Sequence, residues 1–252
     1  MPRNLAIIPV RTGSKRLPQK NLLKFCGKPL FAHAISCSLE AECFDEIHVS
    51  TEDPGVLASS REFGAGVGFL RPSHLADDDA TLQQVCEFVI AEYERKGFEF
   101  DCFCIVWATA PLRTAEDILE GYGLLSEDID AAVGVTYYDL PLYCAQGIDS
   151  EGILQPIFPE MLRKPSSEMP EVVCDNGSFC WVRTSSFKKY GTWLPPKIRG
   201  YVMPRSRSVD LDTEEDWEHL HFLYQLRTMK EKPLFSQDIL KAILVMFWVQ
   251  LV

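Results

Sequence analysis

The chain has 252 residues, of which 46% are hydrophobic, and this is enough apolar material for one sizeable core, which excludes a disordered protein. Its formal net charge of -11 argues against a nucleic-acid-binding protein, because such proteins normally present a basic face to the phosphates. The nine cysteines lack a zinc or redox spacing and no signal peptide is evident, so we expect reduced thiols and a cytoplasmic protein.

The first apolar run, residues 5–8, predicts a strand buried on both faces, and Pro9 ends it. A loop follows at the carboxyl end of this strand, where α/β sheets bind ligands. Its small residues allow backbone amides to approach a phosphate, and six cations crowd around them: Arg11, Lys15, Arg16, Lys20, Lys24 and Lys28. In so acidic a chain this clustering favours an anion site over a solvated turn. A dinucleotide fingerprint and a Walker loop are excluded, because their glycine and Gly-Lys-Ser/Thr patterns are absent.

Residues 8–21 read Ile-Pro-Val-Arg-Thr-Gly-Ser-Lys-Arg-Leu-Pro-Gln-Lys-Asn. This run closely resembles the signature of the acylneuraminate cytidylyltransferases, which join CTP to nine-carbon α-keto acid sugars and release pyrophosphate. The final Lys-Asn pair favours the sialic acid-like branch over the enzymes for the eight-carbon sugar Kdo. The resemblance implies that the nucleotide is bound here by Arg11, Gly13, Ser14, Lys15, Lys20 and Asn21.

Further strands and helices alternate along the chain. A helix is predicted from Pro29, a strand over 46–51 and a helix over 54–63. This alternation is typical of a parallel sheet with crossover helices. We therefore expect an α/β fold with a Rossmann-like, mostly parallel sheet and helices on both faces. The resemblance narrows it to the nucleotide-diphospho-sugar transferase type.

Residues 71–81 combine an arginine, three successive aspartates and a threonine. We favour the aspartates 77–79 as charges at a helix N-terminus over a metal cluster, and we expect Thr81 to cap a helix with one apolar stripe. In the resembled family an Arg-Pro-x-x-Leu-Ala-x-Asp element holds the cytidine. This implies that Arg71 contacts the nucleoside.

A central strand is predicted over 101–109, and Thr114 with Asp117 predicts a capping box for the next helix. Residues 109–113, Thr-Ala-Pro-Leu-Arg, resemble the family's third motif and imply that Thr109 contacts the sugar. Trp and Ala at 107–108 replace the family's usual Gln-Pro on this sugar side. Two roles stay open for Arg113, contact with a substrate anion and a structural tether.

Between 137 and 174 helical periodicity is lost and prolines and glycines punctuate short apolar pieces, which predicts an inserted hairpin and long loop. In the resembled family this region forms a homodimer, so we expect a two-fold dimer. The following run, 174–181, is similar to the pseudaminic acid cytidylyltransferases and implies that Asp175 and Asn176 contact the sugar. An Asn-Gly pair by itself would only indicate a tight hairpin.

Asp210 and Asp212 alternate with apolar residues, so in an extended backbone both carboxylates point to one side and can hold Mg²⁺. Thr213 with Asp216 also predicts a capping box. The predicted reaction is an in-line attack of the sugar hydroxyl on the α-phosphorus of CTP, with Mg²⁺ neutralising the phosphates. We expect three catalytic residues, Arg11, Lys20 and Asp212, and no side chain stands out as a general base.

The sequence thus predicts a single cytidylyltransferase domain over 1–232, with 137–174 as its dimerisation insertion. Its predicted partners are CTP and a nine-carbon acidic sugar, with pseudaminic acid ahead of legionaminic and neuraminic acids. The alternative is a catalytically silent nucleotide-sugar binding protein. The tail 233–252 ends in an apolar run, 239–252, that is shorter than the ~20 residues of a spanning helix, so we expect packing rather than stable membrane insertion.

Overall fold

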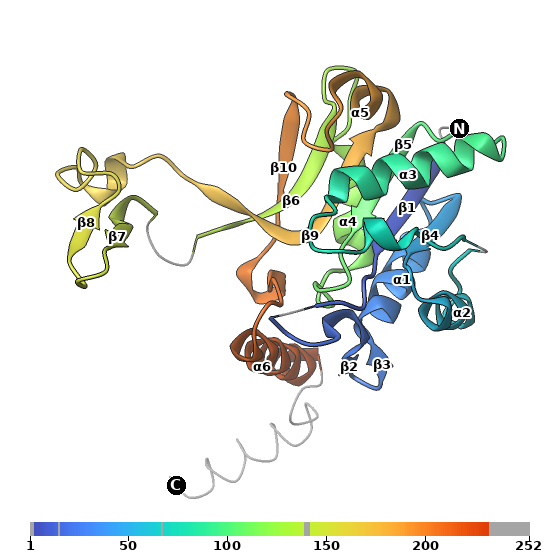
Figure 1. The fold of residues 1–252 in the computed structure, drawn as a ribbon. Coiled ribbons are helices and arrows are strands. Elements are labelled where there is room, and N and C mark those ends of the chain that lie inside the picture. The colour runs from blue at the N-terminus through green and yellow to red at the C-terminus, as the bar shows by residue number, and fades with distance from the viewer. Residues whose placement is uncertain (1–2, 15, 67, 139–141, 232–252) are drawn as a thin grey trace, which may run out of the picture.

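The computed structural model describes residues 3–14, 16–66, 68–138 and 142–231. Lys15 and the apolar tail 233–252, which carry sequence predictions, lie outside the described residues. Within the described chain the core is a six-stranded sheet in the order β10-β6-β9-β5-β1-β4 (Figure 1). The strands are β1 (Asn4–Pro9), β4 (Glu46–Ser50), β5 (Cys102–Val106), β6 (Ala131–Tyr137), β9 (Val173–Arg183) and β10 (Ile198–Val202).

The sheet is mostly parallel. β1 pairs in parallel with β4 and β5, and β6 pairs in parallel with β10. Only β9 among these strands runs the other way, antiparallel to both β5 and β6. The predicted fold class is therefore confirmed, with one reversed strand joining the two parallel parts.

Helices cover both faces of the sheet, as predicted. α1 (Leu30–Glu40), α2 (Pro54–Glu62) and α4 (Ala115–Gly123) pack on one face, and α3 (Leu82–Arg95) and α5 (Thr184–Tyr190) pack on the other. Successive residues of β1 point to opposite faces: Ala6 and Ile8 join the first core, whereas Leu5 and Ile7 join the second. This is why β1 shows no polar alternation in the sequence.

Capping explains where three helices begin. Thr81 and Gln84 form a capping box at α3, and Thr114 and Asp117 form one at α4. Before α6 (Glu214–Glu231), Asp216 accepts hydrogen bonds from the backbone N–H and the hydroxyl of Thr213. These three caps were predicted from the sequence.

The strand predicted over 101–109 is shorter in the structure. β5 ends at Val106, which pairs with Phe179 of β9, and Trp107 then leaves the ladder with its N–H bonded to Ser178 O at 3.1 Å. The Asn-Gly pair at 176–177 does not form a hairpin. It lies inside β9, where the register with β6 shifts and Gly177 has φ +61°, which fits a β-bulge.

Between β6 and β9 the chain leaves the body as a projecting arm, which contains the hairpin of β7 (Gln146–Ile148) and β8 (Leu154–Pro156) (Figure 1). The arm lies within the predicted insertion 137–174, whose end residues belong to β6 and β9. Shorter elements complete the fold: the hairpin of β2 (Lys24–Phe25) and β3 (Lys28–Pro29), and the 3-10 turns η1 (Lys20–Leu22), η2 (Ser73–Leu75), η3 (Leu142–Cys144), η4 (Ser166–Glu168) and η5 (Arg205–Arg207).

A third apolar cluster lies under α6. Leu220 of this helix is fully buried in a cluster with residues from the region between β1 and the start of α1, from the loop after β5 and from the segment before α6, namely Leu17, Phe25, Leu30, Leu112, Val209 and Leu211. The cluster therefore joins two parts of the chain that are far apart in sequence. No helix in the described ranges is long and apolar enough to cross a membrane, and all nine cysteines are free thiols.

Candidate active site

A cavity of about 390 Å³ opens at the carboxyl ends of β1 and β5. This size lies within the range of small-molecule sites, and the carboxyl edge is where open α/β sheets bind ligands. Its walls come from the loop after β1, from residues 71–85, from the end of β5 and from the segment before α6. The residues lining it include Arg11, Arg16, Lys20, Asn21, Arg71, Asp77, Asp78, Trp107, Thr109, Asp210 and Asp212.

The basic loop and the acidic segment meet across this cavity. Lys20 Nζ lies 2.7 Å from Asp212 Oδ1, although the two residues are 192 positions apart in sequence. Arg16 Nη1 lies 2.6 Å from the other oxygen of the same carboxylate. The sequence predicted that these two chain segments share one site, and the structure brings them together.

Asp210 and Asp212 point outward because their neighbours are needed in the core. Val209 and Leu211 are buried in the cluster under α6, so the alternate residues face the cavity. Burial, followed by the charge of Asp212, raises the pKa of Asp210. A buried carboxylate beside a second carboxylate makes a site that a cation stabilises.

These carboxylates suit Mg²⁺ by their chemistry. Magnesium is usually held by one or two carboxylates together with water and substrate phosphates rather than by a full protein cage. The described residues contain no group of three or more potential metal ligands, so Asp210 and Asp212 would form such a two-carboxylate site.

Arg71 is held by a residue that sequence analysis missed. Its Nη2 lies 2.9 Å from Glu52 Oε2, and Glu52 Oε1 accepts hydrogen bonds from the N–H and hydroxyl of Thr12 at 2.8 and 2.7 Å. Burial raises the pKa of Glu52, but the bonds from Thr12 and Arg71 outweigh it and leave the pKa lowered. The one signal in the sequence is the position of Glu52, just after β4.

Arg11 and Asn21 also line the cavity. Arg11 Nη1 lies 3.3 Å from Asp77 O and 3.4 Å from Asp78 Oδ1, and Asn21 Nδ2 donates to Arg11 O at 3.1 Å. Gly13 and Ser14 belong to the same loop but do not line this cavity. Their predicted nucleotide contacts, like that of Lys15, stay predictions.

The aspartates at 77–79 differ from the helix-terminus role predicted for them. Thr81 caps α3, whose first turn has no acidic residue, while Asp77 accepts hydrogen bonds from Asp79 N and Ala80 N and closes its own turn. Asp78 instead faces Arg11. The short side chain of Asp77 satisfies local amides, which competes with capping a helix farther along.

A second cavity of about 370 Å³ adjoins the first and shares Asp210 with it. Asp175 lines this cavity, and burial raises its pKa. Asn176 lines it as well, but its amide is engaged: Nδ2 lies 3.1 Å from Ser208 Oγ, and Oδ1 accepts from Ser178 N. The three predicted sugar contacts are therefore divided, with Thr109 in the first cavity and the other two in the second.

Arg113 is a structural tether. Its Nη1 donates to Ser178 O at 2.5 Å and to Trp107 O at 3.2 Å, and the residue is 5% exposed. It joins the end of β5 to the bulge of β9 and so fixes the cavity wall. This decides between the two roles that the sequence left open.

Comparison with known proteins agrees with this geometry. A family model described as Cytidylyltransferase matches residues 5–120, which contain the basic loop, Arg71 and Thr109. By this match over its first part, the chain is similar to the cytidylyltransferases. It is similar to the pseudaminic acid cytidylyltransferase of Campylobacter jejuni serotype O:2, with 27% identity over 89% of this chain and 97% of the relative. It is also similar to the CMP-N,N'-diacetyllegionaminic acid synthase of Legionella pneumophila, with 29% identity over the same shares.

A solved structure shares the fold of this chain. The CMP:2-keto-3-deoxy-manno-octonic acid synthetase complexed with CTP matches with a TM-score of 0.64 and 18% identity, over 89% of this chain and 99% of that chain. The family match and the named relatives together indicate a nucleotidyltransferase. The family match ends at residue 120, so the role of the acidic pair at 210 and 212 depends on its position in the cavity.

Proposed function

We propose that this chain transfers CMP from CTP to the anomeric hydroxyl of a nine-carbon α-keto acid sugar and releases pyrophosphate. The observation that carries the proposal is the meeting of Lys20 and Arg16 with Asp212 in one cavity. Cations for a triphosphate and carboxylates for a metal ion are the two parts that phosphoryl-type transfer requires. Relatives of similar length are named for CMP transfer to pseudaminic and legionaminic acids.

We assign the residues of the cavity to two parts of CTP, the triphosphate and the nucleoside. Arg11 and Lys20 bind the triphosphate, and Arg71 and Asn21 lie on the nucleoside side, with the Arg71 guanidinium fixed by Glu52. The oxygen of the anomeric hydroxyl forms a bond to the α-phosphorus and its proton is released to water, while the bond to the bridging oxygen breaks and pyrophosphate leaves with that electron pair. Such a reaction needs no covalent enzyme intermediate, because the protein acts by positioning and charge stabilisation.

Asp210 and Asp212 are the residues that would hold Mg²⁺. When bound there, Mg²⁺ supplies neutralisation of the phosphate charge that develops as pyrophosphate leaves. A silent nucleotide-sugar binding protein has no need of this acidic pair beside the cations, so the pair favours the enzyme over that alternative.

Pseudaminic acid is our favoured acceptor. The second cavity adjoins the metal carboxylates through Asp210 and contains Asp175, the residue that the resemblance ties to the pseudaminic branch. The alternatives are legionaminic and neuraminic acids, which share the carboxylate and the nine-carbon skeleton.

We also propose a two-fold homodimer formed through the arm between β6 and β9. The described part of this arm exposes a series of large apolar side chains, with exposures from 46% to 71%: Ile148, Ile153, Leu154, Ile157 and Leu162. So many exposed apolar side chains on one projecting segment are typical of an interface. The arm is therefore the surface that a second copy would cover.

The test is pyrophosphate release from CTP with each of the three sugars in the presence of Mg²⁺. We expect release with pseudaminic acid to exceed release with the other two, and Asp212→Ala to abolish it. Release with none of the three sugars would overturn the proposed function. Full activity of Asp212→Ala would overturn the metal assignment alone.

A further inference from the structure

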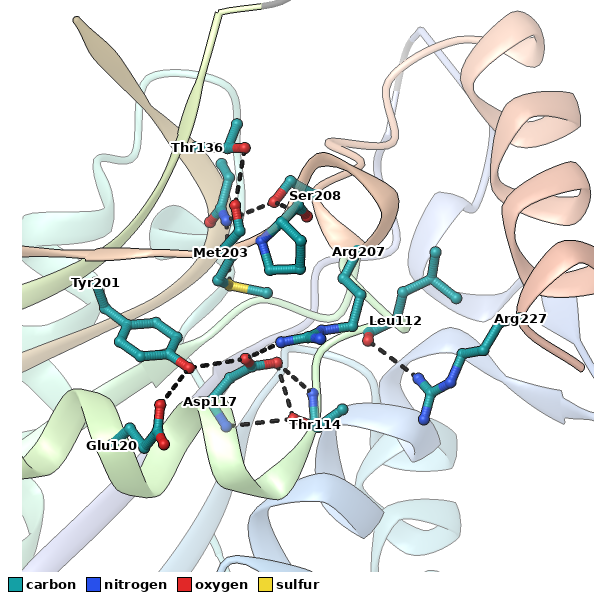
Figure 2. A network of polar contacts seen from close by, with 12 residues as sticks. Leu112, Thr114, Asp117, Glu120, Thr136, Tyr201, Met203, Arg207, Ser208 and Arg227 are labelled. Carbon is teal, nitrogen blue, oxygen red and sulfur yellow. Dashed lines mark hydrogen bonds and ion pairs between the residues drawn. The ribbon is translucent and has the colours of Figure 1, made fainter. Parts of the chain in front are cut away.

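The carboxylate of Asp117 is completely buried in the first turn of α4. Its Oδ2 accepts hydrogen bonds from Thr114 N at 2.8 Å and Thr114 Oγ1 at 2.9 Å, which is the capping box. Its Oδ1 forms an ion pair with Arg207 Nη2 and lies 3.2 Å from the hydroxyl of Tyr201 (Figure 2). The helix cap uses one oxygen, so the second oxygen is available for a separate purpose.

That second oxygen holds the turn η5 against α4. A buried carboxylate is stable only when it is paired and hydrogen-bonded, so Asp117 requires the Arg207 guanidinium. Arg207 Nε is buried and has no hydrogen-bond partner among the described residues, so this guanidinium depends on Asp117 for its place. Burial and the carboxylates of Glu120 and Asp117 raise the pKa of Tyr201, so its hydroxyl stays protonated and can donate.

Arg207 lies only three residues before Asp210, so fixing one restricts the other. Three residues of chain span at most about 10 Å. Ser208 is held from both sides, because it accepts from Asn176 Nδ2 at 3.1 Å and donates to Pro204 O at 3.1 Å. Val209 is buried in the cluster under α6. The segment therefore reaches Asp210 with little freedom to move.

The backbone of β9 also packs against Asp210. A Cβ on Gly177 would lie 3.0 Å from Asp210 Oδ1, so the carboxylate packs directly against this glycine. A displacement of the segment toward Gly177 is therefore blocked by backbone, and the ion pair of Arg207 with Asp117 restrains the start of the segment.

We propose that the Asp117–Arg207 pair is a positioning device that holds Asp210 and Asp212 where they can bind a divalent cation with CTP. Neither residue lines the cavity of the proposed reaction, so both act through the segment 207–212. The inference rests on the proposed function, because it assumes that these carboxylates hold the metal ion.

The experiment compares CTP affinity with Mg²⁺ and with EDTA by calorimetry, without an acceptor sugar. The ratio of the two dissociation constants reports contact between the protein and the bound metal ion, and it needs no turnover. The test variant is Asp117→Asn with Arg207→Gln, because removing both charges avoids the unpaired buried charge that a single substitution leaves. We expect the ratio to fall about tenfold, as for other residues that orient metal ligands, with CTP affinity in EDTA unchanged.

The matched control is Arg183→Gln. Arg183 also tethers two backbone carbonyls, Ile129 O at 3.0 Å and Ser126 O at 2.8 Å, but it lies at the opposite end of β9. We expect this variant to lose thermal stability and keep the wild-type ratio. A wild-type ratio in the double variant would overturn the positioning role. If the wild-type protein binds CTP equally tightly with Mg²⁺ and with EDTA, that result would instead contradict the metal site of the proposed function.

Discussion

Asp212 pairs with two cations of the basic loop, Lys20 and Arg16, which would also meet the triphosphate of CTP in the proposed reaction. Lys20 and Arg16 each pair with one oxygen of its carboxylate, at 2.7 and 2.6 Å. Arg16 is largely exposed, with 72% of its side chain accessible, so its pair is weak and easily exchanged. Binding of CTP would therefore move these cations from the carboxylate to the phosphates and leave Asp212 for the metal ion.

The substitution Asp212→Asn tests this exchange. It removes the competing charge, so Lys20 and Arg16 are free to meet the triphosphate. We expect CTP to bind up to about fivefold more tightly in EDTA, the range of one exposed ion pair. Calorimetry measures the affinity, and Asp216→Asn serves as a control because Asp216 caps α6 without pairing with these cations. Weaker binding of CTP to Asp212→Asn in EDTA would contradict the exchange.

A second residue-scale prediction concerns acid stability. Burial, followed by the charges of Lys96 and Arg71, lowers the pKa of His48 to about 3 from its ordinary 6.5. The unfolded chain binds this proton near 6.5 and the folded protein does not, so stability falls as pH drops from 6.5 toward 3. Urea unfolding above and within this window should show a smaller loss for His48→Phe than for the wild type. Equal losses would indicate that His48 is protonated in the folded protein.

At the scale of single residues the sequence predicted groups whose role follows from local pattern. Asp210 and Asp212 are fixed by alternation with buried neighbours, and Thr81 by its cap. Glu52 was missed as a functional residue, and Arg16 was predicted as a cation of the anion site but not as a partner of Asp212, since both contacts join distant segments. One sequence without relatives carries no signal for such pairs.

At the scale of elements, the arm and β9 show which features of secondary structure the sequence pattern predicts and which it does not. The loss of helical periodicity predicted an insertion over 137–174, and the arm lies in this range between β6 and β9. The Asn-Gly pair suggested a hairpin, but a left-handed Gly177 serves a bulge equally well. The choice depends on β6, whose register with β9 shifts at this point.

The exposed apolar side chains of the arm allow a test of the proposed homodimer. Ile148 of β7 is 71% exposed, so Ile148→Asp places a charge in the proposed interface without disturbing a core. We expect light scattering to give twice the chain mass for the wild type and the single-chain mass for Ile148→Asp. Leu119→Asp, on the exposed side of α4 at 49% exposure, should stay dimeric. A wild-type monomer would contradict the proposed dimer.

Across the whole molecule, the apolar cluster under α6 couples the two ends of the site. It contains Leu17 and Phe25 from the loop after β1, and Val209 and Leu211 from the acidic segment. The sequence predicted both segments and the cap of α6, but not that this helix would pack over both of them, because packing between distant elements does not change local periodicity. The cations and the carboxylates are thus supported by one shared core.

Because this cluster supports both ends of the site, a substitution in it should weaken CTP binding, whereas a substitution elsewhere in the core should lower stability alone. Leu220 and Leu5 are both fully buried, but Leu220 packs in the cluster under α6 and Leu5 in the core between the sheet and α3. Each change to alanine should lower the free energy of unfolding by about 2–5 kcal/mol. At a temperature where both variants are folded, we expect Leu220→Ala to weaken CTP binding with Mg²⁺ and Leu5→Ala to leave it unchanged. Equal CTP affinity in the two variants would mean that the cations and carboxylates are held independently of α6.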